Sequence, residues 1–485
     1  MASIAAPHNK RLSRAQRRRL KRRQARKARD ARCQLRHLHD RLPPQARQLL
    51  NALAPAFSRP AFLRFVVLAL AAILTLGGRT VANLLRTLGA LAPGHFSTFH
   101  RLLSRCRWRA RRLAYALATT VLERCLPSGP IHLVGDDTVC EHPGPKVYGK
   151  GCHRDPVRST KSFTAYRWGH KWVVLAVLVH FSFARRLWAL PILVALYFSE
   201  EENTRQRRRH KTPSQLLRQQ LCVLLRWFPQ RRFVLAADGN YATHELARLA
   251  ARFSGRLTFV SKFYPNANLY KPAPAYAGSG RPPKKGAELP CPAAVVAQTK
   301  RRQRLNVSWY GGGRRDVAVV TGTGLWYRSG EGTVPVRWVF VHDRTGTHRD
   351  EYFFTTDQGL SAAAVIETYT GRWNIETTFQ EMRSYVGLET TRGWCQSTVL
   401  RAEPCLFGLY TVVALLYACL PAKVARVRVV SWPGKQDVTF SDAMTTVRRW
   451  LWQQWVFAIP GHSEAFEKLP RSFREVLLAG LAPAS

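Results

Sequence analysis

The order of apolar patterns between residues 131 and 263 limits the folds open to this chain more than any other feature of its sequence. Short runs rich in β-branched residues are typical of strands, and longer runs with a 3.6-residue apolar period are typical of helices. The segment contains three strands, a helix, a strand, a helix and a strand: Ile131–Val139, Lys171–Phe181, Leu190–Tyr197, Pro213–Phe228, Arg232–Ala237, His244–Phe253 and Leu257–Phe263. This order predicts an α/β domain.

Acidic residues stand at the ends of two of these predicted strands. Asp136 and Asp137 precede Thr138 near the end of the first strand, and Asp238 ends the fourth. An aspartate at a strand end is usually a turn or cap residue. Because parallel strands that end together present their terminal side chains to one crevice, these acids are also candidates for a shared site.

A third acid, Glu376, lies on a helix predicted from Leu360 to Leu388. At about 100° per residue, one face of this helix carries a carboxylate flanked by two guanidinium groups and a phenol, which suits a polyanion and a metal ion. The alternative is a surface helix with Arg–Glu pairs. This face consists of Tyr369, Arg372, Glu376, Gln380 and Arg383, and an apolar stripe that would anchor the helix consists of Ile375, Phe379, Met382 and Val386.

Three motifs, GDDT, ADGNY and YTGRWNIE, resemble the acid motifs of insertion-sequence transposases of the DDE class. The similarity extends from about Pro127 to Trp394, and it includes the spacing Tyr, two residues, Arg, three residues, Glu, six residues, basic residue. It implies an RNase H-like nuclease that catalyses cut-and-paste DNA transposition. It also implies that Tyr369, Arg372 and Arg383 contact the transposon end, with Arg383 standing where the family usually has Lys.

The resemblance makes Asp137, Asp238 and Glu376 the predicted catalytic residues and metal ligands. Clustered carboxylates repel one another unless cations neutralise them, and hard oxygen ligands suit Mg²⁺ or Mn²⁺. Two such ions per site would support strand cleavage and strand transfer. Successive strand side chains point to opposite faces, so only one acid of the first pair can face the crevice. In the resembling family the ligand commonly precedes Thr directly, which favours Asp137 and leaves Asp136 as the alternative first ligand.

An antiparallel β insertion is predicted between the second acid and the glutamate. A Pro- and Gly-rich loop, Pro265–Pro292, comes first, and Gly311–Gly313 is expected to be a hairpin turn because no P-loop lysine follows. In relatives, a tryptophan of such an insertion can stack on an extruded base, with core packing as the alternative for each candidate. The predicted strands are Asn306–Tyr310, Asp316–Val320, Val336–His342 and Glu351–Thr355, and the candidate tryptophans are Trp309, Trp326 and Trp338.

The charge of the chain calls for a polyanionic partner. Lys and Arg total 76 against 29 Asp and Glu, giving a net charge of +47, while 46% hydrophobic residues exclude a disordered histone-like chain. Fourteen of the basic residues lie between Lys10 and Arg36 with a single acid, Asp30. We expect this tail to be disordered alone and helical on DNA. A solvated tail or a targeting signal is the alternative.

Residues 43–126 are predicted to be helical and to bind DNA. Val81–Leu88 and Ser97–Arg107, with Ser97 as N-cap, resemble a helix-turn-helix with a long turn, and a plain helical bundle is the alternative. In either case His100, Arg101 and Arg105 share one face. The apolar run Phe65–Gly78 is too short to span a bilayer and is expected to be a buried helix.

The complete prediction divides the chain into six parts. They are a basic tail (1–40), a helical DNA-binding domain (41–126), the two parts of the catalytic domain (127–263 and 357–400), the β insertion (264–356) and a C-terminal helical region (401–485). The C-terminal region contains a buried helical stretch at Val399–Leu420 and an amphipathic helix at Ser441–Trp455.

The predicted partners are double-stranded DNA, both terminal inverted repeats and target, and a second copy of the chain when DNA is bound. No membrane is expected, and the location would be the bacterial cytoplasm, at the nucleoid. Ten cysteines without a C-x-x-C motif suggest reduced thiols, with zinc at Cys140, Cys152 and His153 as the less favoured alternative. Two other functions are considered: a domesticated or inactive transposase, and a structural nucleic-acid-binding protein.

Overall fold

The structure, a computed structural model, describes residues 13–483 except 156–157, 161, 277, 279–281, 426–434 and 436. Its first strands and helices follow the predicted order. The strands are β1 (Ile131–Glu141), β2 (Gly151–Arg154), β3 (Tyr166–Val179), β4 (Trp188–Tyr197), β5 (Phe233–Ala237) and β6 (Leu257–Lys262); the helices among them are α7 (Glu200–Arg205), α8 (Pro213–Trp227), η3 (Gly239–Tyr241) and α9 (His244–Arg252).

β1 is the centre of this part of the sheet. It runs antiparallel to β3 and parallel to β5, while β3 runs antiparallel to β4 and β5 runs parallel to β6. The side-by-side order is therefore β4, β3, β1, β5, β6. The sequence did not predict β2, because four residues without apolar alternation carry no strand signal; it pairs with the start of β3.

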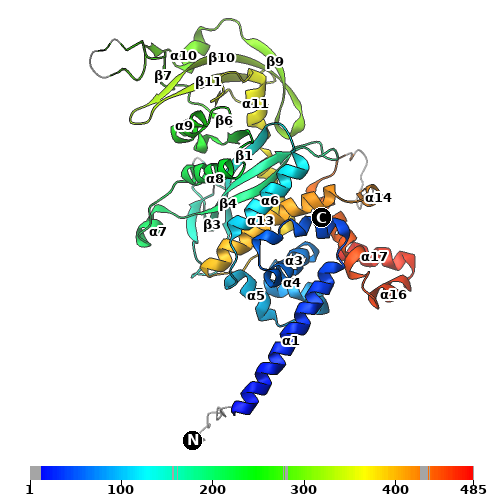
Figure 1. Cartoon of the computed structure of the whole chain (residues 1–485). Coiled ribbons are helices and arrows are strands. Elements are labelled where there is room, and N and C mark those ends of the chain that lie inside the picture. Colours follow the sequence, from blue (N-terminus) through cyan, green and yellow to red (C-terminus); the bar gives the residue numbers. More distant parts are fainter. Residues whose placement is uncertain are drawn as a thin grey trace.

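The predicted β insertion is present, and its strands extend the same sheet. β12 pairs antiparallel with β6, which continues the sheet through β11, β10, β7 and β8, with β9 on β10 (Figure 1). The elements are β7 (Leu269–Tyr270), β8 (Glu288–Leu289), α10 (Pro292–Gln298), β9 (Gln303–Ser308), η4 (Tyr310–Gly312), β10 (Arg314–Arg328), β11 (Gly332–Asp343) and β12 (Glu351–Thr355).

Strands β10 and β11 are much longer than the runs predicted for them. The glycines Gly322 and Gly324 read as a break in the sequence, yet they lie inside β10. Gly322 pairs with Trp338, and a Cβ added at Gly322 would lie 2.6 Å from the Trp338 ring, so the glycine makes room for the indole. The predicted turn at Gly311–Gly313 does connect β9 to β10, with positive φ at Gly311 and Gly312.

The glutamate helix is not one continuous helix. α11 (Ala362–Gly371) and α12 (Asn374–Glu381) are separated at Arg372 and Trp373, and the π-helix η5 (Met382–Val386) follows. At the junction the amides of Ile375 and Glu376 donate to carbonyls only three residues back, which tightens the turn. The predicted apolar stripe is nonetheless buried throughout.

The remaining helices form a region beside the sheet. At the N-terminal side they are α1 (Arg14–Asp40), α2 (Pro44–Asn51), η1 (Ala54–Ala56), α3 (Arg59–Leu74), α4 (Val81–Leu88), η2 (Gly89–Leu91), α5 (Phe96–Ser104) and α6 (Ala110–Cys125). At the C-terminal side they are α13 (Gln396–Ala418), α14 (Ala422–Ala425), α15 (Phe440–Leu451), η6 (Trp452–Val456), α16 (His462–Glu467) and α17 (Arg471–Leu481). Contacts between α3 and α15 join the two groups, so the predicted DNA-binding and C-terminal regions share one core.

The basic tail is a helix from Arg14 onward, which differs from the disorder expected off DNA. Its C-terminal turns carry Leu35 and Leu38, which are buried, and the Trp455 indole donates to the Leu38 carbonyl at 3.1 Å. The earlier turns extend away from the body, at the opposite end from the insertion (Figure 1). Packing of the last turns explains the helix, because an anchored end supplies the nucleus that an isolated basic helix lacks.

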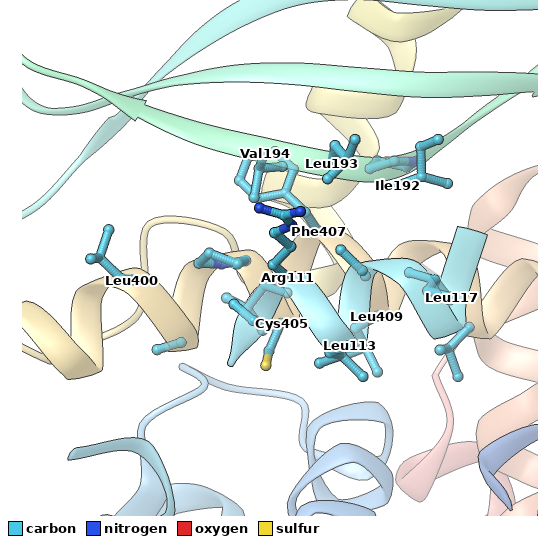
Figure 2. A pocket seen from close by; sticks show the side chains of 18 of the residues that line it. Arg111, Leu113, Leu117, Ile192, Leu193, Val194, Leu400, Cys405, Phe407 and Leu409 are labelled. Atoms are coloured by element: carbon cyan, nitrogen blue, oxygen red, sulfur yellow. The ribbon is translucent and has the colours of Figure 1, made fainter. Parts of the chain in front are cut away.

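Helix α13 is a core helix. It is long and apolar enough to cross a membrane by length and composition, but 67% of its most apolar window is buried inside the protein. Between α13, α6 and β4 lies an apolar cavity of about 400 Å³ (Figure 2). Ile192, Leu193 and Val194 of β4 line one side, and Leu113 of α6 and Phe407 of α13 lie across from them. The lining contains no acid, which separates this cavity from the acidic residues described next.

Candidate active site

The register of β1 and β5 brings two acids to the same level of the sheet. Gly135 pairs with Ala237 at the end of the β1–β5 pairing, so Asp136, within β1, and Asp238, directly after β5, lie side by side. Asp137 has different neighbours: Lys171 of β3 is 3.0 Å from its Oδ1, and the Tyr241 hydroxyl donates to its Oδ2 at 2.7 Å. The two neighbouring aspartates therefore have separate surroundings, as strand alternation requires.

Arg372 links the first strand to the glutamate helix. Its Nη1 lies 2.9 Å from Asp136 Oδ2, and its Nη2 lies 2.8 Å from Glu376 Oε1. The side chain of Arg372 is 7% exposed, while those of Asp136 and Glu376 are 18% and 37% exposed. The guanidinium thus stands between two carboxylates at the edge of solvent.

Tyr369 and Arg383 complete the predicted face. The Tyr369 hydroxyl donates to Asp238 Oδ1 at 3.4 Å, and its ring stacks on Phe353 with centroids 4.4 Å apart. Arg383 donates to the Thr138 hydroxyl, to the Val139 carbonyl at 3.2 Å, and pairs with Glu389 at 3.0 Å. The structure brings both side chains to the ends of β1 and β5. Gln380, the remaining member of the face, is exposed.

Burial and charge act together on the ionisable groups of this crevice. The pKa of Asp136 is raised to about 7, chiefly by burial and also by the charges of Asp137 and Asp238, against the opposing charge of Arg372. Burial lowers the pKa of Arg372, but Asp136, Tyr369 and Glu376 outweigh it and raise the pKa above the ordinary value. The pKa of Tyr241 is also raised, first by burial and then by Asp137. The crevice carries more negative charge than Arg372 neutralises.

Within the described part of the chain, no three His, Cys, Asp or Glu side chains lie close enough together to hold a metal ion. This applies to the zinc alternative too: Cys140 is buried, Cys152 is exposed and the pKa of His153 is lowered to about 4, chiefly by burial. At the acids the reason is visible, because the Arg372 guanidinium lies between Asp136 and Glu376. The donors nevertheless fit a hard cation, since all are carboxylate oxygens and their charge is only partly balanced.

The tryptophans of the insertion are packed in the core. Trp309, Trp326 and Trp338 are 9%, 8% and 2% exposed. Trp168 and Trp394, outside the insertion, are exposed instead. The sequence did not single these two out, because exposure depends on which strand face and which loop surface remain uncovered.

Further sequence predictions concern α5 and the crevice itself. His100, Arg101 and Arg105 are exposed on α5 or at its end. The predicted N-cap, Ser97, is wrong: the helix begins at Phe96, and the His95 ring caps it by accepting from the Ser97 amide. Two crevice residues escaped prediction. Lys171 carries no motif, whereas Tyr241 belongs to ADGNY and could have been found there.

Comparison with known proteins gives a family and solved structures that share little sequence identity with this chain. No curated protein matches the chain. A cryo-EM structure titled as a synaptic complex of piggyBac transposase with hairpin DNA aligns with 87% of this chain and 75% of that chain, at 11% identity and a TM-score of 0.37. The family model described as DDE superfamily endonuclease matches residues 52–316. Because this match spans more than half of the chain and includes β1, with Asp136 and Asp137, and Asp238 directly after β5, the protein belongs to the DDE superfamily of endonucleases.

Proposed function

We propose that this endonuclease is a transposase, which cleaves DNA strands at the ends of an element and joins them to target DNA by cut-and-paste transposition. The observation that carries the proposal is that Arg372 joins Asp136 to Glu376, while Asp238 lies level with Asp136 directly after the parallel strand β5. The strand order β4, β3, β1, β5, β6 supports an RNase H-like catalytic domain, interrupted by the β insertion. The net charge of +47 supports a polyanionic substrate.

Divalent ions, Mg²⁺ or Mn²⁺ and two per site, are the cofactors of this proposal. Such ions would polarise the attacking and leaving oxygens of an in-line phosphoryl transfer. The proposed ligands are Asp238, Glu376 and one of the first two aspartates. Asp137, the sequence-based choice, is held by Lys171 and Tyr241. Two observations support Asp136 as that ligand. It lies level with Asp238 of the neighbouring strand end, and Arg372 links it to Glu376.

Side chains around the crevice would position the DNA substrate. Tyr369, Arg372 and Arg383 border the crevice, and they are the proposed contacts to the transposon end. Because Arg372 already pairs with two acids, its phosphate contact requires that it leave at least one of them. Arg101 and Arg105 of α5 and the exposed turns of α1 would contact duplex outside the crevice.

The wider setting follows from the same proposal. Terminal inverted repeats and target duplex are the proposed DNA partners, and two copies of the chain would act together on DNA. The proposed location is the bacterial cytoplasm, at the nucleoid.

A cleavage assay tests the proposal. Asp238→Asn and Glu376→Gln should abolish Mg²⁺-dependent cleavage of DNA that carries the element's ends, while binding of those ends in EDTA changes little. Each substitution removes a metal ligand and retains the phosphate contacts. Cleavage at the rate of the unmodified protein by either variant would refute the site.

The second candidate function is an inactive, DNA-binding descendant of a transposase. The basic surface alone would serve that function, and absence of cleavage by the unmodified protein on its own element ends would favour it. The presence of all the acids in the crevice favours the active enzyme.

A further inference from the structure

The hairpin of β2 and β3 exposes an unusual surface about 20 Å from the acids. Asp136 pairs with Val174 of β3, and Trp168 lies six residues before Val174, near the start of that strand, a distance of about 20 Å at ~3.4 Å per residue. β1 itself runs past the acids toward this end of the sheet and ends at Glu141. The surface therefore lies where a DNA strand leaving the crevice along β1 would arrive.

Aromatic and basic side chains share this surface. Tyr166 and Trp168 are two residues apart on β3, and their directly opposite partners on β2 are Arg154 and Cys152. All four residues are exposed, with Trp168 at 62%. Because opposite residues of an antiparallel pair share a face, an arginine lies beside two open aromatic rings.

A second tryptophan borders the same surface across an open groove of about 800 Å³. Trp394 is 68% exposed, and its carbonyl accepts from the Tyr148 amide at 2.9 Å, which ties its loop to the loop before β2. Lys150 lies over the Trp168 ring at 6.0 Å, and Lys146 lines the groove. Among the described residues, neither indole lies within stacking distance of another aromatic ring.

We propose that Trp168 and Trp394 stack on the bases of unpaired DNA, and that the neighbouring lysines and Arg154 hold its phosphates. Bases offer flat π-faces whatever their sequence, and a basic groove with open aromatic rings is how proteins bind single strands. A duplex hides these faces within its own stack, so the aromatic part of the site selects unpaired DNA. The proposal rests on DNA as the substrate, and it adds a binding site for a strand released from the duplex near the acids.

The test separates stacking from charge. Full-length protein in EDTA is titrated with fluorescent oligothymidylate and with an abasic oligomer of the same length and charge. The unmodified protein should bind the oligothymidylate at least about fivefold more tightly, since one stacked base contributes roughly that factor. Trp168→Ala with Trp394→Ala should bind both oligomers equally, and Trp394→Phe should keep most of the preference.

Phe473→Ala is the matched control, since Phe473 is an aromatic residue on α17 that is also more than half exposed. It should leave the preference unchanged. A double tryptophan variant that keeps the fivefold preference would overturn the proposal. If that variant keeps the preference but changes its mass in analytical ultracentrifugation, the surface is a protein contact, and the proposal fails in that case as well.

The assay contains no metal ion and does not measure cleavage, so its outcome is independent of the transposase proposal. A preference for bases in a protein that never cleaves DNA would leave the strand-binding site standing alone. Cleavage without such a preference would leave the transposase standing and remove the strand-binding site.

Discussion

Two buried arginine sites lie at either end of the segment that carries Glu376. They differ in the groups that bind the guanidinium: carboxylates at one site and backbone carbonyls at the other. In the crevice, Arg372 is held by the carboxylates of Asp136 and Glu376. At the other end, Arg79 and Arg448 both donate to the carbonyl of Tyr385 in η5, at 2.7 and 3.5 Å. Among the described residues, neither of these two arginines forms an ion pair.

The second site is a pair of helix caps. Arg79 also donates to the Ala72 carbonyl at 3.3 Å, and Arg448 donates to the Ile73 carbonyl at 2.6 Å, so both satisfy carbonyls that the end of α3 leaves unpaired. Burial lowers the pKa of each guanidinium to about 10, and Arg79 contributes to the shift at Arg448. Backbone carbonyls, and not carboxylates, hold these two guanidinium groups in place.

The two sites differ in whether another cation could take the place of the arginine. Carboxylates can accept a metal ion in place of an arginine, whereas buried carbonyls cannot replace their donors without loss. Arg372 therefore stands at a position where a cation can be exchanged. Arg79 and Arg448 instead hold the N-terminal helices, α15 and the glutamate helix together.

The largest expected effect distinguishes the two aspartates of the crevice. Asp136→Asn should abolish cleavage, because Asp136 is level with Asp238, while Asp137→Asn should keep measurable activity. Asp136→Cys should be inactive in Mg²⁺ and partly restored by Mn²⁺, since thiolates accept the softer ion more readily. Restoration by Mn²⁺ at Asp137→Cys alone would return the ligand to Asp137.

The pKa of Asp136 predicts a pH dependence of stability in the metal-free protein. A folded pKa of about 7 against an unfolded value of about 4 means that the folded state holds this proton more tightly. The contribution of this proton to the free energy of unfolding, up to ~4 kcal/mol, is fully present below about pH 4 and is lost as pH rises through about 7. Urea unfolding in EDTA at several pH values should show this loss, and Asp136→Asn should remove it. Equal pH profiles for both proteins would contradict the raised pKa.

Arg448→Met should destabilise the protein by about 3 kcal/mol, because each lost hydrogen bond from a charged donor costs roughly 1.5–3 kcal/mol. Urea denaturation provides the measurement. Arg449→Met is the control, because Arg449 is the next residue on α15 and its one ion pair among the described residues is with Glu475 at the surface. This substitution should cost less than about 1 kcal/mol. Equal losses for the two variants would mean that the caps at Tyr385 contribute little.

The smallest effect concerns cation exchange in the crevice. Arg372→Gln should bind Mn²⁺ about tenfold more tightly in the absence of DNA, a difference of ~1.4 kcal/mol, because a competing positive charge is removed. Isothermal titration calorimetry measures the affinity. Arg186→Gln, which breaks the similar pair with Glu381 on the same helix, should have no effect. Weaker Mn²⁺ binding by Arg372→Gln would instead make Arg372 a support for the ligands.

Much of the architecture was predictable because it depends on local patterns. The seven elements from Ile131 to Phe263 appear in the predicted order, and β12 matches its predicted bounds. Length and interruption were not predictable in the same way. Gly322 lies within β10, where it makes room for Trp338 across the ladder, and at the break Arg372 forms an ion pair with Asp136 of β1, 236 residues away in sequence.

By itself, the sequence determined the DDE family, the order of strands and helices along the chain, the three acidic motifs and the need for a polyanionic partner, because periodicity, motif spacing and net charge are properties of the chain alone. The tertiary structure decided which neighbours each acid has and which tryptophans remain open. The linear motif favoured Asp137, but it does not show the neighbours of either aspartate. Only the register of β1 against β5 and β3 gives Asp136 the Arg372 guanidinium and Asp137 the Lys171 amine. Register and exposure arise from contacts between distant segments, which no local pattern encodes.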